Sequence, residues 1–245
     1  MADWRESPTS AVGLNTAARG AQAVGVDAGL RSYMLSVYNY MASGVLLTGI
    51  VALLFAQSGM AAQVLQGPGI LKYVIMFSPL VFVMVLSFGI NRLSTQAAQG
   101  LFWAYAAVMG LSLSSIFLVY TGASIATTFF ATAAAFAGLS LFGYTTKKDL
   151  SAFGTFLIMG VVGLLVASLL NIFLKSPVMD LAISGIGVLL FAGLTAYDTQ
   201  KIKGMYAYVR GTDMMGKTVV MGALSLYLDF INMFMFLLRF MGNRD

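Results

Sequence analysis

Residues 218–241 read TVVMGALSLYLDFINMFMFLLRFM, an apolar run with a single acid, Asp229, near its middle. At 1.5 Å per helical residue this run spans about 36 Å, enough to cross a hydrocarbon core of about 30 Å. An uncompensated carboxylate costs several kcal/mol in such surroundings. Ser225, Asp229 and Asn232 stand at i, i+4 and i+7, so they share one helix face. We expect this polar face to look inward, to protein or water.

A second acid in a comparable setting, Asp198, lies in the preceding apolar run, within TAYDTQK at residues 195–201. An ionisable residue inside a span indicates a functional site, and Asp198 is the partner that the sequence offers to Asp229. Two neighbouring carboxylates in a low dielectric cannot both ionise cheaply, so they would share one proton. Their oxygen atoms also suit Ca²⁺, whereas soft metals favour Cys and His. Such a pair, if the two acids lie within a few Å of each other, would be a proton sensor and would also suit a hard divalent cation.

Composition decides the class of protein. With 59% hydrophobic and 9% charged residues, the chain has too little polar surface for a soluble domain, so we expect an all-α integral membrane protein. The chain contains no Cys and no His, which excludes disulfides, Cys-based metal or redox sites and the usual zinc ligand. The net charge of +5 comes from basic residues in loops beside apolar spans and indicates topology, not binding of nucleic acid. We expect no tightly bound cofactor.

Seven apolar runs are each long enough to cross a membrane, which predicts a seven-transmembrane-helix bundle. We place them at residues 33–57, 70–90, 99–121, 124–144, 153–174, 181–202 and 218–241. The joint at residues 121–123 is so short that the third and fourth spans must form a tight hairpin. Residues 1–30 are rich in Ala, Gly, Ser and Thr and predict a flexible cytoplasmic tail, so that the transmembrane domain covers residues 31–245.

The distribution of Lys and Arg predicts the orientation. With a cytoplasmic amino terminus, ten basic residues lie inside and four outside, and the odd number of spans places the carboxyl terminus on the opposite side. The ten are Arg5, Arg19, Arg31, Arg92, Lys147, Lys148, Lys201, Lys203, Arg210 and Lys217, and the four are Lys72, Lys175, Arg239 and Arg244. Six full spans followed by a re-entrant last segment also agree with an inward polar stripe.

Known intramembrane enzymes and pumps can be compared with these residues. A retinal-type pump needs a Schiff-base Lys in its last span, and residues 218–240 contain none. A rhomboid-type protease needs a His to activate its Ser, and the chain has no His. An intramembrane aspartyl protease stays open, because Tyr197, Asp198 and Asp229 resemble the acids of presenilin-like enzymes. However, residues 226–228 read LYL where that family has Gly-x-Gly.

Three motifs resemble a single family. They are GALSLYLDFIN at residues 222–232 with its continuation to Phe240, AYDTQKI at residues 196–202, and TTKKDL at residues 145–150. All three resemble the Bax inhibitor-1 family, in its bacterial branch. The resemblance covers essentially all seven spans, and its C-terminal motif is long and specific.

The resemblance implies a seven-helix protein of the bacterial inner membrane whose last helix is central, with a pH-sensitive calcium leak and no enzymatic activity. Its expected partners are the lipid bilayer, calcium and protons. In that family two acids on the sixth and seventh helices share a proton, and the matching residues here are Asp198 and Asp229. An Arg near the cytoplasmic end of the second helix latches to the sixth-helix acid, and Arg92 is the local candidate. Relatives are also associated with a protease or another membrane complex, so a regulatory role is an alternative.

The positions of the charged residues set a condition on the dyad. Asp198 lies three residues before Lys201, whereas Asp229 lies twelve residues after Lys217, about 18 Å along a helix. The two acids meet only if the sixth helix runs deeper than its charges suggest, or if part of residues 217–224 lies outside the membrane.

Overall fold

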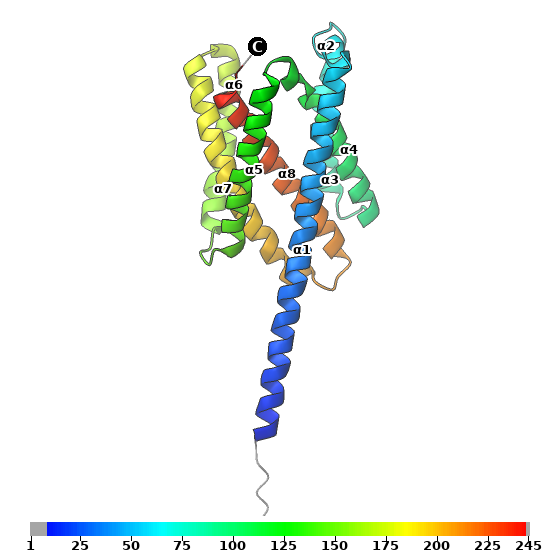
Figure 1. The fold of residues 1–245 in the computed structure, drawn as a ribbon, viewed down its shortest axis with the longest axis vertical. Helices are drawn as coiled ribbons and strands as arrows, with labels where there is room; N and C mark the ends of the chain where they lie inside the picture. The colour runs from blue at the N-terminus through cyan, green and yellow to red at the C-terminus, as the bar shows by residue number, and fades with distance from the viewer. Residues whose placement is uncertain (1–8, 244–245) are drawn as a thin grey trace, which may run out of the picture.

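The computed structural model describes the backbone of residues 9–243 and the side chains of residues 28–243. The elements are α1 (Thr9–Gln57), α2 (Met60–Leu65), α3 (Leu71–Gly89), α4 (Thr95–Leu113), the 3-10 helix η1 (Ser114–Leu118), α5 (Gly122–Thr145), α6 (Ser151–Leu174), α7 (Pro177–Val209) and α8 (Met214–Met241). No strand occurs between residues 9 and 243. The predicted all-α fold is confirmed (Figure 1).

Seven helices of the described chain are long and apolar enough to cross a membrane. Their bounds are Ala28–Gln57, Leu71–Gly89, Thr95–Leu118, Gly122–Thr145, Ser151–Leu174, Pro177–Val209 and Met214–Met241. Each overlaps one of the seven predicted runs, and α4 with η1 forms the third. The last span is one unbroken helix of 28 residues, about 42 Å long, which is long enough to cross a membrane.

The joint between the third and fourth spans is as short as predicted. Helix η1 ends at Leu118 and α5 begins at Gly122. The hydroxyl group of Thr121 caps α5 by accepting a hydrogen bond from the backbone N–H of Ser124, at 3.2 Å. The cap satisfies one of the backbone N–H groups that a helix start leaves without a partner. The short joint is confirmed, but the tight hairpin is not, because α5 packs mainly on α7 and α8 and meets the third span mainly at η1.

Helix α1 is much longer than its span. It begins at Thr9, and the boundary predicted at residue 30 lies inside it. Figure 1 shows its first half projecting beyond the end of the bundle. Residues 1–8 lie outside the described chain, so the flexibility predicted for residues 1–30 stays a prediction.

Helix α8 is the most enclosed of the spans. It packs against α1, α4, α5 and α7, and it runs obliquely across the bundle (Figure 1). In its most apolar window 67% of the residues are buried, against 11–39% in the other six spans. Side chains on the buried faces of α8 therefore meet protein rather than lipid.

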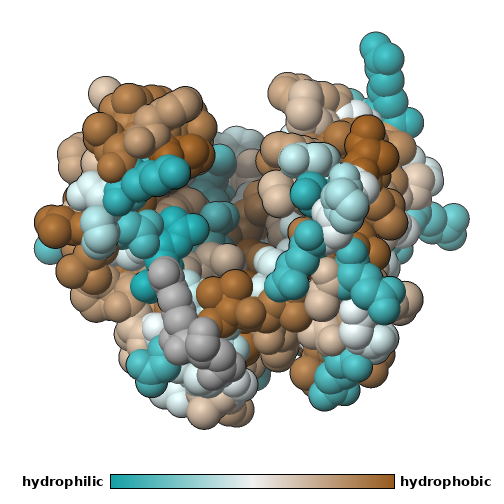
Figure 2. All heavy atoms as spheres, turned by 90° about the horizontal axis from the view of Figure 1, so that it is seen from above, coloured by the Kyte–Doolittle hydropathy of each residue, from teal (hydrophilic) through white to brown (hydrophobic). Residues whose placement is uncertain are grey.

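The outer surface is apolar where a bilayer would contact it. In the most hydrophobic 18-residue stretch of α3 and of α6, only 11% of the residues are buried. The exposed side chains of these two helices are mainly Leu, Ile, Val, Met and Phe. Seen from the end that carries α2, apolar side chains dominate the sides, and polar side chains gather on the end face (Figure 2). This distribution suits a bundle that lipid surrounds.

Two glycines let α7 approach its neighbours closely. A Cβ atom at Gly143 of α5 would overlap the carbonyl oxygen of Ala196 on α7. At Gly154 of α6 it would overlap the ring of Tyr197. Because lipid supplies no hydrophobic force between helices, such close backbone packing is what holds them together. It fixes α7 from two sides immediately before Asp198.

We expect Gly143→Ala to destabilise the protein by about 1–3 kcal/mol, because the new methyl group forces α5 away from α7. Gly138→Ala on the same helix is the matched control, since nothing lies within 4 Å of the Cβ it would add. Thermal unfolding of both variants in one detergent, followed by far-UV circular dichroism, measures the difference. Equal unfolding midpoints for the two variants would contradict the close contact of α5 with α7.

Candidate functional site

Asp229 places a carboxyl group inside the bundle. It lies in the middle of α8 and is only 5% exposed. Its Oδ2 atom is buried and has no hydrogen-bond partner among the described residues. The neighbouring Leu226 and Phe230 are buried as well. A lone negative charge there costs several kcal/mol unless a proton, a cation or a hydrogen-bond donor accompanies it.

The other two residues of the predicted polar face, Ser225 and Asn232, are half-buried. The Asn232 side-chain amide donates a hydrogen bond to the carbonyl oxygen of Leu228 one turn back, at 2.8 Å. At least one of its donors is therefore used within α8. Asp229 is the fully buried member of this face.

The two acids lie on adjacent antiparallel helices, and contacts on both sides of them fix the register. Gly222 on α8 faces Ile202 on α7, where a Cβ atom would come 3.1 Å from Cγ2. Further along, the rings of Phe236 on α8 and Phe191 on α7 stack with centroids 5.8 Å apart. Both acids lie between these two contacts. The register thus brings them to the same stretch of the α7–α8 interface.

The depth of the two acids differs from what their neighbouring charges suggest. Helix α7 continues past Lys201 to Val209, and α8 begins at Met214. Asp198 therefore lies roughly 16 Å and Asp229 roughly 22 Å from the α7–α8 turn, measured along each helix. The first condition of the sequence analysis agrees with this geometry, because the sixth helix continues past its charged residues. That part of residues 217–224 lies outside the membrane stays a prediction.

The two carboxyl groups interact electrostatically. The charge of Asp198, which is half-buried, acts on the carboxyl group of Asp229. Lys201, one turn further along α7, acts on Asp198 with the opposite sign. Asp229 thus has Asp198 beside it, and Asp198 has Lys201 one turn further along α7.

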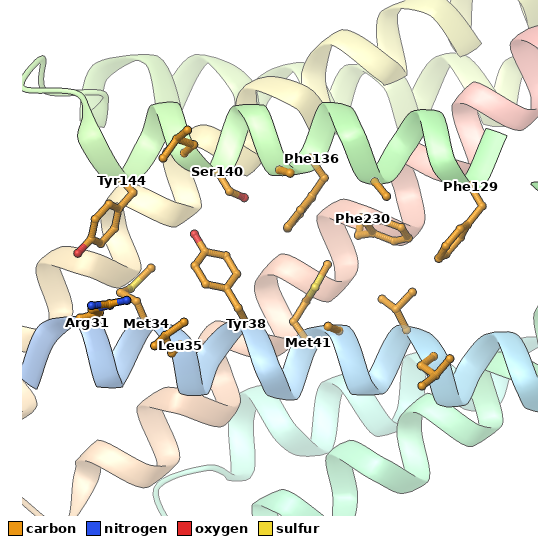
Figure 3. Close-up of a pocket in the computed structure, with 16 residues that line it drawn as sticks. Arg31, Met34, Leu35, Tyr38, Met41, Phe129, Phe136, Ser140, Tyr144 and Phe230 are labelled. Carbon is orange, nitrogen blue, oxygen red and sulfur yellow. The ribbon is translucent and has the colours of Figure 1, made fainter. Parts of the chain in front are cut away.

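Three hydroxyl groups from three helices gather at Thr199, the residue that follows Asp198 on α7. The Tyr38 hydroxyl group on α1 lies close to the side chains of Ser140 on α5 and Thr199 on α7. In Figure 3 the ring of Tyr38 points across toward Ser140. Ser140 Oγ and Thr199 Oγ1 are buried and make no well-aligned hydrogen bond within the described chain. Polar atoms arranged in this way can hold ordered water.

None of these three hydroxyls was predicted as a site residue. Thr199 follows Asp198 inside the AYDTQKI motif, and this position is the one signal that could have indicated it. Tyr38 and Ser140 sit in ordinary apolar runs and come together only through the packing around α7.

A polar clamp joins two of the sequence motifs. The Gln200 side chain on α7 accepts a hydrogen bond from the N–H of Leu150 at 2.9 Å and donates one to the carbonyl oxygen of Lys148 at 2.8 Å. Lys203 donates to the carbonyl oxygen of Tyr144 at 2.7 Å. The TTKKDL connection is thereby fastened to α7 at the AYDTQKI motif and just beyond it.

Comparison with known proteins agrees with these motifs. A family model described as "Inhibitor of apoptosis-promoting Bax1" matches residues 30–245. The chain belongs to the Bax inhibitor-1 family. It is 48% identical to the inner membrane protein YbhL of Escherichia coli K12, over 89% of this chain and 94% of YbhL. It is also 49% identical to an uncharacterized protein of Rickettsia prowazekii, over 89% of this chain and 92% of that protein.

The Arg expected as a latch in the Bax inhibitor-1 family makes no ion pair with the acids among the described residues. Arg92 is exposed in the turn between α3 and α4, and α3 packs on α2 and α4. No ion pair joins Arg92 to Asp198, both of which are described. The structure does not bring these two residues together, and the latch stays a prediction.

The two acids alone are a small donor set for a metal ion. The described residues contain no group of three or more acidic, His or Cys side chains that could hold a metal ion. Calcium takes six to eight oxygen ligands, so at the Asp pair it would need the nearby hydroxyls, backbone carbonyls and water as well.

A second buried hydroxyl contact ties α8 to two other helices. Thr48 Oγ1 on α1 donates a hydrogen bond to the carbonyl oxygen of Ala106 on α4, at 2.8 Å. Its only proton is then used, so the Tyr227 hydroxyl group on α8 donates to Thr48 Oγ1, at 2.6 Å. The Tyr105 ring packs edge-on against Tyr227, but its own hydroxyl group is buried without a partner in this part of the chain.

We expect Tyr227→Phe to destabilise the protein by about 0.5–1.5 kcal/mol, because it removes the donor to Thr48. Tyr105→Phe should be neutral or stabilising, since it removes a buried hydroxyl group that has no partner. The unfolding midpoints of the two variants are measured in the same detergent. The comparison is matched, because each variant loses one phenolic hydroxyl group and the two rings are neighbours. A larger loss from Tyr105→Phe would show that its hydroxyl group has a partner, such as water.

Proposed function

We propose that this member of the Bax inhibitor-1 family is a pH-sensitive calcium-leak channel of the bacterial inner membrane. A proton shared between Asp198 and Asp229 controls it. The observation that supports this most is the Asp229 carboxyl group, which is buried, has an unpartnered oxygen atom and feels the charge of a second acid. The name of the relative YbhL supports the inner membrane as the location.

The shared proton couples charge to helix packing. While one proton serves both acids, the α7–α8 interface contains at most one negative charge. Loss of that proton leaves two like charges in a low dielectric, and they repel each other unless water or a cation enters between them. Protons and calcium therefore compete for the same oxygen atoms. A change in this competition shifts the population between a packed and a hydrated interface.

The composition of the site suits passage more than storage of calcium. Two carboxylates give a divalent cation its charge balance, and the hydroxyls of Tyr38, Ser140 and Thr199 add oxygen ligands. The set is too small and too loosely placed for a high-affinity cage. An ion that binds weakly also leaves readily, as conduction requires.

The proposed topology has a cytoplasmic amino terminus and a carboxyl terminus on the opposite side, with α8 central among the other helices. Its support is the predominance of basic residues at the end of the bundle where α1 enters, together with the burial of α8. Arg92 lies at that same end, where we propose that it pairs with Asp198 in another conformation.

Calcium entry into dye-loaded proteoliposomes, scanned across pH, tests the proposal. We expect the wild-type leak to change with pH, and we expect Asp198→Asn or Asp229→Asn to flatten that dependence, because neither amide can share the proton. Absence of flux above empty liposomes at every pH, or identical profiles for wild type and both variants, would overturn the proposal.

Asp149→Asn is the matched control. This acid lies in the α5–α6 connection, where hydrogen bonds from the Ser151 side chain and backbone N–H lower the pKa of Asp149. It is therefore ionised throughout the neutral range, and its replacement should keep the wild-type pH dependence. If all three Asp→Asn variants flatten the profile alike, the response is a general effect of surface charge and not of the dyad.

A further inference from the structure

A large apolar pocket lies between α1 and α5. Its volume is about 760 Å³, and Phe230 of α8 contributes to its wall. Figure 3 shows α1 along one side of the pocket and α5 along the other, with side chains of both pointing into the space between them. Its volume is within the range of about 300–1,000 Å³ that is typical of ligand sites.

The pocket opens sideways, toward the bilayer. Leu35, Leu46 and Leu141 line it and are 51%, 64% and 64% exposed. These residues belong to helices that cross the membrane, so the molecules that reach the opening are lipids. The occupant must therefore present hydrocarbon to most of the wall.

The two ends of the pocket differ in chemistry. Arg31 and Tyr144 lie at one end, where α1 enters its span (Figure 3). A second cation is close to that end, because the Lys203 ammonium group lies over the Tyr144 ring, 4.8 Å from its centroid. At the other end, the rings of Phe129 and Phe230 meet edge-to-face with centroids 5.7 Å apart. The pocket thus has basic side chains at one end and aromatic rings at the other end, which we call its floor.

The aromatic pair also marks a boundary. A second, smaller space of about 280 Å³ continues beyond it, and Val45, Phe129 and Phe230 line both. The first pocket therefore runs along α1 from Arg31 to about Val45, roughly 21 Å at 1.5 Å per residue. One leaflet with its headgroup region is about 20–22 Å thick, half of the whole bilayer. The pocket has the length of a single lipid molecule.

We propose that this pocket is a binding site for an anionic phospholipid of the surrounding bilayer. One acyl chain lies along α1 as far as the Phe129–Phe230 pair, and the phosphate group lies at Arg31. Basic side chains at the cytoplasmic side of a gap between transmembrane helices are suited to anionic headgroups. The proposal goes beyond ion flux, because lipid binding can be measured whether or not the protein conducts calcium.

The test uses the full chain in nanodiscs that contain phosphatidylcholine and phosphatidylglycerol. One of the two lipids carries a photoreactive diazirine near the end of an acyl chain, and labelled peptides are identified by mass spectrometry. We expect phosphatidylglycerol to label residues 31–46 and 129–144 several-fold more than α6, which contacts lipid without a pocket. The phosphatidylcholine probe should show a much smaller difference between these segments.

Two pairs of variants separate headgroup from acyl-chain recognition. Arg31→Gln should remove the several-fold preference for phosphatidylglycerol, whereas Arg210→Gln, another exposed basic residue at the same end, should keep it. Ala137→Trp fills the pocket and should lower labelling by both lipids, whereas Ala134→Trp, exposed on α5 outside the pocket, should not.

Two outcomes would overturn the proposal. Labelling of the pocket segments no stronger than that of α6 would show ordinary annular lipid. Equal labelling by the two lipids in wild type would show an acyl groove without recognition of the anionic headgroup.

Discussion

The buried carboxyl group of Asp229 is the constraint on which the arrangement of the other helices depends. A charge at that depth is tolerated only beside partners that the bundle supplies. Helix α8 accordingly packs against α1, α4, α5 and α7, and α7 brings Asp198 to the same interface. The hydroxyls of Tyr38 and Ser140 come from the helices that enclose this side. The site is thus made by packing around one acid, and no single segment contains it.

Helix α7 connects this interior to the end of the bundle. Close contacts at Gly143 and Gly154 hold it against α5 and α6. Two residues beyond Asp198, Gln200 binds the backbone of the α5–α6 connection on both its donor and acceptor sides. If α7 moves at the level of Asp198, it must therefore either break the two Gln200 hydrogen bonds or move the α5–α6 connection with it. Packed interfaces of this kind switch between discrete arrangements instead of deforming gradually.

Hydropathy predicted the seven spans because lipid requires long apolar runs, and that requirement is local in sequence. Hydropathy predicted the ends of the helices less accurately. The sixth span was predicted to end at residue 202, whereas α7 continues to Val209 with Lys201 and Lys203 on its surface. Basic side chains near a helix end reach the interface along their own stems, so charge does not mark where a helix stops. The acids could be identified because a carboxylate in an apolar run is conspicuous. The hydroxyls and the lipid pocket could not, since α1 and α5 are far apart in sequence and face each other only after folding.

The acid pair and the pocket share the same structural elements. Phe230, which forms part of the pocket floor, follows Asp229 on α8, and Tyr38, which lines the pocket, reaches toward Thr199 beside Asp198. A chain that fills the pocket would press on the turn of α8 that carries the buried acid and would also hold Tyr38 in place. If both proposals hold, protonation from within the bundle and lipid binding from outside act on one helix turn. Two ligands that favour the same arrangement of a shared element must strengthen each other's binding, and the coupling is reciprocal. A coupling of this kind between bound anionic lipid and the state of the acid pair would need no contact between the lipid phosphate and the carboxyl groups.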